Sequence, residues 1–207
     1  MSYMSSLSVE DLDNVVLTTR QLNSTTSPIP SFRDEDTLDS PDSRRKYDVF
    51  LSFRGEDTRS SFTSHLYFTL QTSGIIVFKD DHSLQRGDPI PTSLLRGIED
   101  SRISVIVFSK NYANSKWCMN ELVKIMECQR TIGHRVLPVF YNVDPSEIRC
   151  QTGEFGKSFQ NLLNRIVPED ELMAVKWRDA LREAGGLAGF LVLNFRFFIL
   201  RSYLHFK

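Results

Sequence analysis

The sequence has no excess of charge of either sign. Its 25 Lys and Arg residues are offset by 26 Asp and Glu residues, which leaves a formal net charge of −1. A protein that binds nucleic acid non-specifically uses an excess of positive charge to neutralise phosphates. We therefore expect no nucleic-acid partner.

Cysteine is also scarce. The three cysteines, Cys118, Cys128 and Cys150, are odd in number, and their spacing fits no zinc framework. Two of them lie in predicted core elements, which is typical of a reduced, intracellular protein. Residues 1–10 lack the basic and apolar segments of a secretory signal. We expect a cytoplasmic or nuclear location and no bound metal.

Long apolar runs are missing as well. Residues 190–207 are rich in Phe and carry only basic charges, but Asn194 and Arg196 interrupt them. They are too short for a membrane span, which takes about 20 apolar residues. This atypical tail could contact a membrane surface, cover the sheet or promote aggregation. At the other end, residues 1–43 are rich in Ser, Thr, Asp and Pro without sustained periodicity, which predicts a disordered leader.

Between these ends, short apolar runs alternate with helical patterns. Tyr47 to Phe53 form an almost continuous apolar run, which suits a strand buried on both faces. Further strands are predicted at 75–78, 103–108 and 136–141, and 185–193 is the only apolar candidate for a fifth. Helices are predicted at 58–72, 92–100, 117–130, 154–165 and 170–184. This alternation predicts an α/β domain over 46–189, with a parallel sheet and helices on both faces.

A charged glycine loop, Arg54 to Arg59, follows the first strand. In open α/β sheets, ligands bind at the carboxyl ends of the strands, in the crevice where strand order reverses. This loop is therefore the first place to look for a site.

Several motifs in this region resemble those of the Toll/interleukin-receptor (TIR) domain in its plant immune-receptor form. They include DVFLSFRGEDTR (48–59), GIIVFKDD (74–81), SKWCMNELVKIMECQ (115–129) and LPVFYNVDPSEIR (137–149). The resemblance extends over roughly 145 residues in the right order. It implies a flavodoxin-like three-layer sandwich with a five-stranded parallel sheet.

The resemblance also implies a function. Many plant TIR domains are NAD+ nucleosidases, which hydrolyse the nicotinamide–ribose bond when the domains self-associate and so signal in innate immunity. NAD+ would be the substrate, and no cofactor is needed. The implied partners are other copies of the chain and other TIR-containing immune receptors. The alternative is a non-catalytic adaptor that binds such receptors.

The family's catalytic glutamate matches Glu121. Nicotinamide leaves as a neutral amide, and the transition state resembles an oxocarbenium ion, so one carboxylate beside the ribose can stabilise the developing charge. Spacing alone favours a solvated helix residue that pairs with Lys124, and it is the resemblance that favours a catalytic role.

Each of the remaining candidate residues has a functional and a structural interpretation. Backbone donors around Gly55 and the charges of Arg54 and Arg59 could meet a pyrophosphate, or Asp57 and Thr58 could merely cap the next helix. The loop candidates are Arg54, Gly55, Glu56, Asp57, Thr58 and Arg59.

Asp88 matches a ligand-contacting position of the family, or it is a turn acid. Trp117 could stack on a substrate ring or anchor the core, and Ser115 could cap its helix or touch the ribose. Ser64 and His65 match a pair in the family's helical self-association face, or they are ordinary packed or solvated residues.

Overall fold

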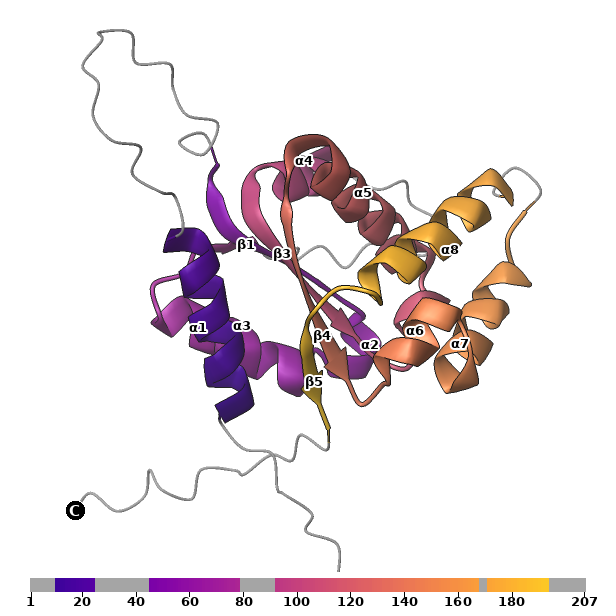
Figure 1. Ribbon diagram of the computed structural model, residues 1–207, viewed down its shortest axis with the longest axis horizontal. Helices are drawn as coiled ribbons and strands as arrows, with labels where there is room; N and C mark the ends of the chain where they lie inside the picture. The colour runs from indigo at the N-terminus through magenta and orange to yellow at the C-terminus, as the bar shows by residue number, and fades with distance from the viewer. Residues whose placement is uncertain (1–9, 25–44, 79–91, 168–170, 194–207) are drawn as a thin grey trace, which may run out of the picture.

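The described residues of this computed structural model, 10–24, 45–78, 92–167 and 171–193, contain one sheet of five parallel strands. The strand order is β2-β1-β3-β4-β5 (Figure 1). The strands are β1 (Tyr47–Phe53), β2 (Val77–Phe78), β3 (Ser101–Phe108), β4 (Arg135–Tyr141) and β5 (Phe190–Val192). The predicted flavodoxin-like α/β fold is confirmed, and β5 lies inside the span expected for it.

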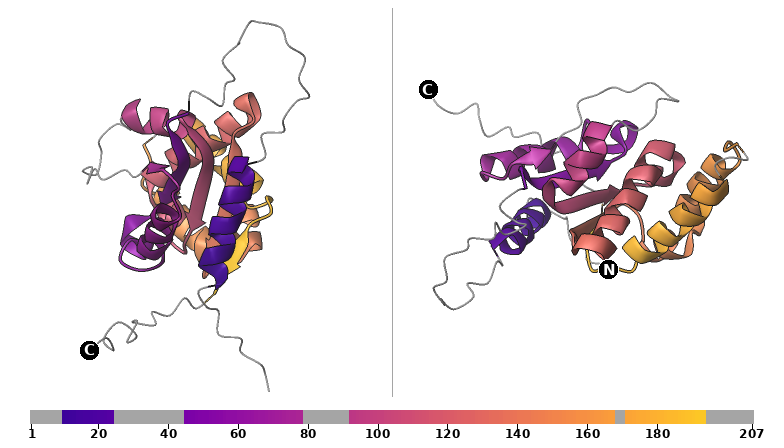
Figure 2. Two further views of the ribbon diagram at one scale, coloured as in Figure 1. Left: turned by 90° about the vertical axis from the view of Figure 1, so that its left-hand side faces the viewer. Right: turned by 90° about the horizontal axis from the view of Figure 1, so that it is seen from above.

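Helices cover both faces of the sheet, which makes the three layers. One face is covered by α4 (Thr92–Glu99), α5 (Lys116–Ile132), α6 (Pro145–Cys150), α7 (Gly153–Leu163) and α8 (Glu171–Ala184). The other is covered by α1 (Glu10–Ser24) and α3 (Phe62–Thr72). Figure 2 shows the sheet between α1 and the pair α7 and α8. Each face therefore has its own apolar core.

The alternation of side chains along β1 divides it between the two cores. Phe50 packs in the core under α5, whereas Val49 and Leu51 pack in the core under α3. Successive strand residues point to opposite faces, so Ser52 shares the α5 side with Phe50. A buried hydroxyl thus faces α5 near the carboxyl end of β1.

The helix predicted over 58–72 is broken. A single turn, α2 (Gly55–Thr58), ends before α3 begins at Phe62. The break turns Thr58 inward, where its hydroxyl accepts a hydrogen bond from Thr63 at 2.7 Å. Ser61 rather than Asp57 or Thr58 occupies the cap position of α3, so the capping alternative does not hold.

The leader predicted to be disordered over 1–43 contains a helix, and the prediction is wrong for residues 10–24. Leu12, Val15, Val16 and Thr19 recur at helical spacing and are buried. This face packs against α3, β3 and β5, and the Arg20 guanidinium donates to the Ser73 carbonyl at 2.7 Å. The polar composition of 1–43 as a whole concealed a short amphipathic stretch.

The expected boundary at residue 189 is also wrong, because the sheet continues beyond it. Phe190, Leu191 and Val192 pair with Val139 to Tyr141 of β4. Residues 194–207 of the predicted tail lie outside the described residues. Within the described part of the chain, no helix is both long enough and apolar enough to cross a membrane.

Candidate active site

The carboxyl ends of β1 and β3 lie side by side at the centre of the sheet. Ser52 pairs in register with Ile106, and Phe53 with Val107. From β1 the chain crosses to β2 on one side and later returns to β3 on the other. This reversal is the topological switch point, the usual ligand crevice of open α/β sheets.

Glu121 of α5 lies at this point and is nearly buried, with 6% of its surface exposed. The Ser52 hydroxyl donates to its Oε2 at 2.6 Å. Lys124 pairs with Glu99 at 2.6 Å. The picture of Glu121 as a solvated residue paired with Lys124 therefore does not hold.

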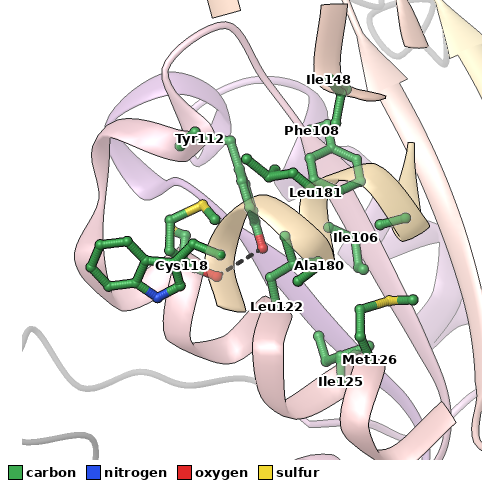
Figure 3. Close-up of a cluster of buried hydrophobic side chains, with 14 of the residues drawn as sticks. Ile106, Phe108, Tyr112, Cys118, Leu122, Ile125, Met126, Ile148, Ala180 and Leu181 are labelled. Carbon is green, nitrogen blue, oxygen red and sulfur yellow. Dashed lines mark hydrogen bonds between the residues drawn. The ribbon is translucent and has the colours of Figure 1, made fainter. Parts of the chain in front are cut away.

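Two further groups complete the surroundings of Ser52. The oxygen atoms of Ser52 and Tyr112 are 2.9 Å apart, and the Tyr112 hydroxyl donates to the Cys118 carbonyl at 3.1 Å. Figure 3 shows the Tyr112 side chain reaching across to the peptide of Cys118. Tyr112 comes from the 3-10 turn Tyr112–Asn114 that follows β3. Glu121, Ser52 and Tyr112 thus join α5, β1 and the segment after β3.

The Cys118 thiol is close to this group but is not a nucleophile. Burial, and then the neighbouring Glu121 charge, raise the pKa of Cys118 well above its usual range. The thiolate is the reactive form of cysteine, so the buried thiol is inert. It donates instead to the Phe53 carbonyl at 3.7 Å. The carboxylate is therefore the chemically useful group in this cluster.

Asp57 ties the loop after β1 to the loop after β3. Its carboxylate accepts from the Ser109 hydroxyl at 2.6 Å and from the Asn111 backbone at 3.0 Å, and it pairs with Arg54. Burial alone would raise the pKa of Asp57, but the Ser109 hydrogen bond, the Arg54 charge and the Asn111 bond outweigh it and lower the pKa. The ionised Asp57 carboxylate therefore holds the two loops together at the carboxyl ends of β1 and β3.

The two arginines of the 54–59 loop differ in their contacts. Arg54 is paired with Asp57 and Glu56, so its charge is used within the loop. Arg59 is exposed and lies over the Phe53 ring at 5.6 Å. A Cβ at Gly55 would come within 2.9 Å of the Arg59 Nε, so a side chain there would displace this arginine. Of the two arginines, Arg59 has the exposed side chain, and its contact with a substrate anion stays a prediction.

Comparison with known proteins identifies the domain. A family model described as TIR domain matches residues 46–196. The chain belongs to the TIR family. It is 51% identical over 173 residues to Disease resistance protein RPV1 of Vitis rotundifolia, a match that covers 81% of this chain and 12% of that protein.

Other relatives agree with this assignment. TMV resistance protein N of Nicotiana glutinosa is 50% identical over 151 residues, which are 72% of this chain and 13% of that protein. This TIR chain therefore spans about an eighth of the curated relatives it matches. Among solved structures, the TIR domains of the activated Roq1 resistosome are 44% identical with a TM-score of 0.62, over 76% of this chain and 90% of that one.

The start of α5 contributes two more candidate residues to this TIR domain. Ser115 is the N-cap of the helix, and its hydroxyl accepts from the Cys118 backbone N–H at 3.3 Å. Trp117 is half-buried and packs against the core on the α5 side. The structural reading of each is thus observed, whereas a contact with substrate stays a prediction. Asp88 lies outside the described residues.

Ser64 and His65 of the TIR domain lie on α3, on the opposite face of the sheet from Glu121. Ser64 is exposed and its hydroxyl donates to the Arg59 carbonyl, and His65 is half-buried. A role in self-association stays a prediction. The two residues could act in assembly without touching the candidate active site.

Sequence reasoning missed four residues that organise the site: Ser52, Ser109, Asn111 and Tyr112. One signal was available, because Ser52 is a lone hydroxyl inside an otherwise apolar buried run. A buried polar side chain needs a partner, so its position predicted a polar group opposite it. Within the described residues, no group of acids, histidines and cysteines is arranged to hold a metal ion.

Proposed function

We propose that this TIR domain hydrolyses NAD+ at its nicotinamide–ribose bond, with Glu121 as the catalytic residue. The observation that supports the proposal is a nearly buried carboxylate at the β1/β3 switch point, held by the Ser52 hydroxyl at 2.6 Å. A carboxylate is costly to bury, and this point of the sheet is where a dinucleotide binds in open α/β folds.

The chemistry follows from the leaving group. The bond between the ribose carbon and the ring nitrogen breaks, its electron pair neutralises the nicotinamide, and positive charge develops on the ribose. Glu121 would hold the ribose hydroxyls and stabilise that charge from its nearly buried position, where electrostatic attraction is stronger than in water. Water then takes the place of nicotinamide and releases a proton. Arg59 is the loop group best placed to meet the pyrophosphate.

We further propose that catalysis depends on assembly and serves plant innate immunity. The relatives are named as disease resistance proteins, and the Roq1 TIR domains belong to an activated resistosome. The partners would be further copies of this chain and other TIR-containing receptors. The self-association face would include Ser64 and His65 of α3.

The deciding experiment measures nicotinamide release from NAD+ over a range of protein concentrations. Glu121→Ala should reduce turnover by about two to three orders of magnitude, because the charge that stabilises the transition state is lost. Glu127→Ala is the matched control, since Glu127 is an exposed carboxylate on the same helix. Equal turnover by the Glu121 variant would refute the assignment of the catalytic residue.

The competing function is a non-catalytic adaptor that uses the same faces to bind receptors. It predicts self-association and receptor binding with no nicotinamide release at any protein concentration. The buried Glu121 favours the enzyme, because an adaptor gains nothing from a carboxylate at the switch point and pays its desolvation cost.

A further inference from the structure

We infer that Ser52 and Tyr112 form a hydroxyl relay that positions Glu121 for catalysis. This inference rests on the proposed function, since it assigns a role to groups around the proposed catalytic carboxylate. Neither residue lies in the loop from which substrate contacts were expected, and neither is exposed: both have 0% of their surface accessible. They are positioning residues, which act through Glu121.

The number of available hydrogens sets the direction of the relay. An ionised carboxylate only accepts hydrogen bonds, so the Ser52 hydrogen is directed to Glu121 Oε2 at 2.6 Å. The 2.9 Å contact between Ser52 and Tyr112 must then take its hydrogen from Tyr112. Tyr112 shares that hydrogen with the Cys118 carbonyl at 3.1 Å. The Ser52 hydroxyl therefore points toward the carboxylate, while Tyr112 contacts both Ser52 and the Cys118 carbonyl, and hydrogen bonds linked in such a network polarise one another.

The relay is anchored on rigid elements. Ser52 lies in the central strand β1, which has neighbours on both sides. The Tyr112 ring packs edge-on against Phe108 at the end of β3, with ring centroids 4.9 Å apart. The Cys118 carbonyl belongs to the first turn of α5, the helix that carries Glu121. The relay thus fixes both the carboxylate and the start of its helix relative to the sheet.

Such positioning should act on the chemical step more than on substrate binding. A catalytic group has to lie within roughly 0.5 Å of its productive position, and a displacement of about 1 Å can cost on the order of 100-fold in rate. Removal of the Ser52 hydroxyl leaves the Glu121 charge in place but removes the 2.6 Å hydrogen bond to its Oε2. We therefore expect kcat to fall while KM changes little.

The test compares three single-atom or near-isosteric variants of the full chain. Ser52→Ala and Tyr112→Phe each remove one hydroxyl of the relay. Ser104→Ala is the matched control, because Ser104 is equally buried in a central strand but bonds to His134 at 2.8 Å. We expect kcat for nicotinamide release to fall at least about tenfold in Ser52→Ala and less in Tyr112→Phe, with KM within about threefold of the parent. The control should retain the parent kcat.

A second readout does not depend on turnover. In protein labelled with ¹³C at Glu side chains, the carboxyl resonance of Glu121 is identified by its absence from the spectrum of Glu121→Gln. Loss of a donated hydrogen bond changes the electronic environment of that carboxyl carbon. The resonance should move in Ser52→Ala and in Tyr112→Phe and stay in place in Ser104→Ala.

The outcomes separate the relay from the proposed function. An active parent whose Ser52→Ala variant keeps its kcat overturns the positioning role. If the unmodified protein releases no nicotinamide, the proposed hydrolase activity is refuted. The shift of the Glu121 resonance then tests by itself whether Ser52 and Tyr112 position Glu121. A resonance that does not move in Ser52→Ala overturns the relay whatever the activity.

Discussion

At the scale of single residues, the polar groups at the carboxyl ends of β1 and β3 hold one another in place. Asp57 accepts from Ser109 and from the Asn111 backbone and pairs with Arg54, so three separate groups depend on one carboxylate. A buried acceptor that loses its charge leaves its donors without full compensation. The loop after β1 is therefore held in place by Asp57 more than by any apolar side chain of its own.

Asp57→Asn should lower the free energy of unfolding by roughly 1–3 kcal/mol, the cost of weakening charge-assisted hydrogen bonds in a partly buried site. Because the folded-state pKa of Asp57 is lowered, its contribution is present above the unfolded value of 3.8 and is lost as pH falls through the folded value. Urea unfolding at pH 7 measures the loss. Asp179→Asn, which removes an exposed partner of Arg182, should have almost no effect. Equal effects of the two variants would contradict this role of Asp57.

His134 predicts a second pH dependence. The ring is buried with its Nε2 at 2.8 Å from Ser104 Oγ, and no partner of its Nδ1 exists among the described residues. Burial and then the Arg45 charge lower the pKa of His134 from 6.5 to about 4. The unfolded chain therefore takes up the proton first, and stability falls as pH drops from 6.5 toward 4.

His134→Gln should reduce this pH dependence, because the amide can still bond to Ser104 but does not titrate. The lowered pKa of His134 limits the stability lost between pH 6.5 and pH 4 to roughly 3 kcal/mol. Urea midpoints at pH 7 and pH 4.5 are compared for both proteins. A drop of the same size in the variant would show that other groups cause the acid sensitivity.

At the scale of elements, α1 is the longest helix that sequence reasoning missed. Val15 is fully buried against the α3 side of the sheet, whereas Leu17 of the same helix is 52% exposed. Val15→Ala should cost roughly 2–3 kcal/mol of stability, from lost apolar burial and the cavity left behind. Leu17→Ala should cost far less, as judged by thermal or urea unfolding. Similar losses would mean that α1 does not pack as described.

Strands and helices with a clear hydrophobic pattern could be predicted from the sequence. Elements that depend on tertiary contacts could not. The runs of β1, β3 and β4 stand out because both faces of each strand are buried. The end of α5 was predictable from Gly133, which adopts a left-handed conformation with a φ of 65°. The helix α6 was not, although Asp144 caps it through Ser146 at 2.7 Å, because the Asp-Pro-Ser run also suits a turn.

The candidate site shows the same limit. Glu121 was identified through the resemblance, since nothing in its spacing along α5 distinguishes it from a surface residue. Its partners could not be found from the chain alone, because Ser52 is 69 residues away in sequence and meets it only after β1 and β3 pair. A polar residue inside an apolar strand therefore indicates that a polar partner lies opposite it in the fold.

At the scale of the whole molecule, the proposed assembly face and the proposed active site lie on opposite sides of the sheet. We therefore expect Ser64→Ala with His65→Ala to reduce self-association, measured by sedimentation velocity, without changing turnover per assembled copy. Nicotinamide release should need a higher protein concentration by about tenfold, which corresponds to about 1.4 kcal/mol of association free energy. Thr72→Ala, an exposed change on the same helix, is the control. A variant that assembles normally would remove these residues from the interface.

The contact between α1 and β5 also determines how the domain would respond to tension. Helix α1 is the first described element and β5 the last, and they pack side by side. A pull applied at residues 10 and 193 would load this contact at the margin of the sheet. It would also load the contacts of α1 with α3 and β3, because the same face of the helix packs against all three elements. Tension on the two ends would therefore act first on the face of the sheet that α1 covers, whereas Glu121 lies on the opposite face with α5.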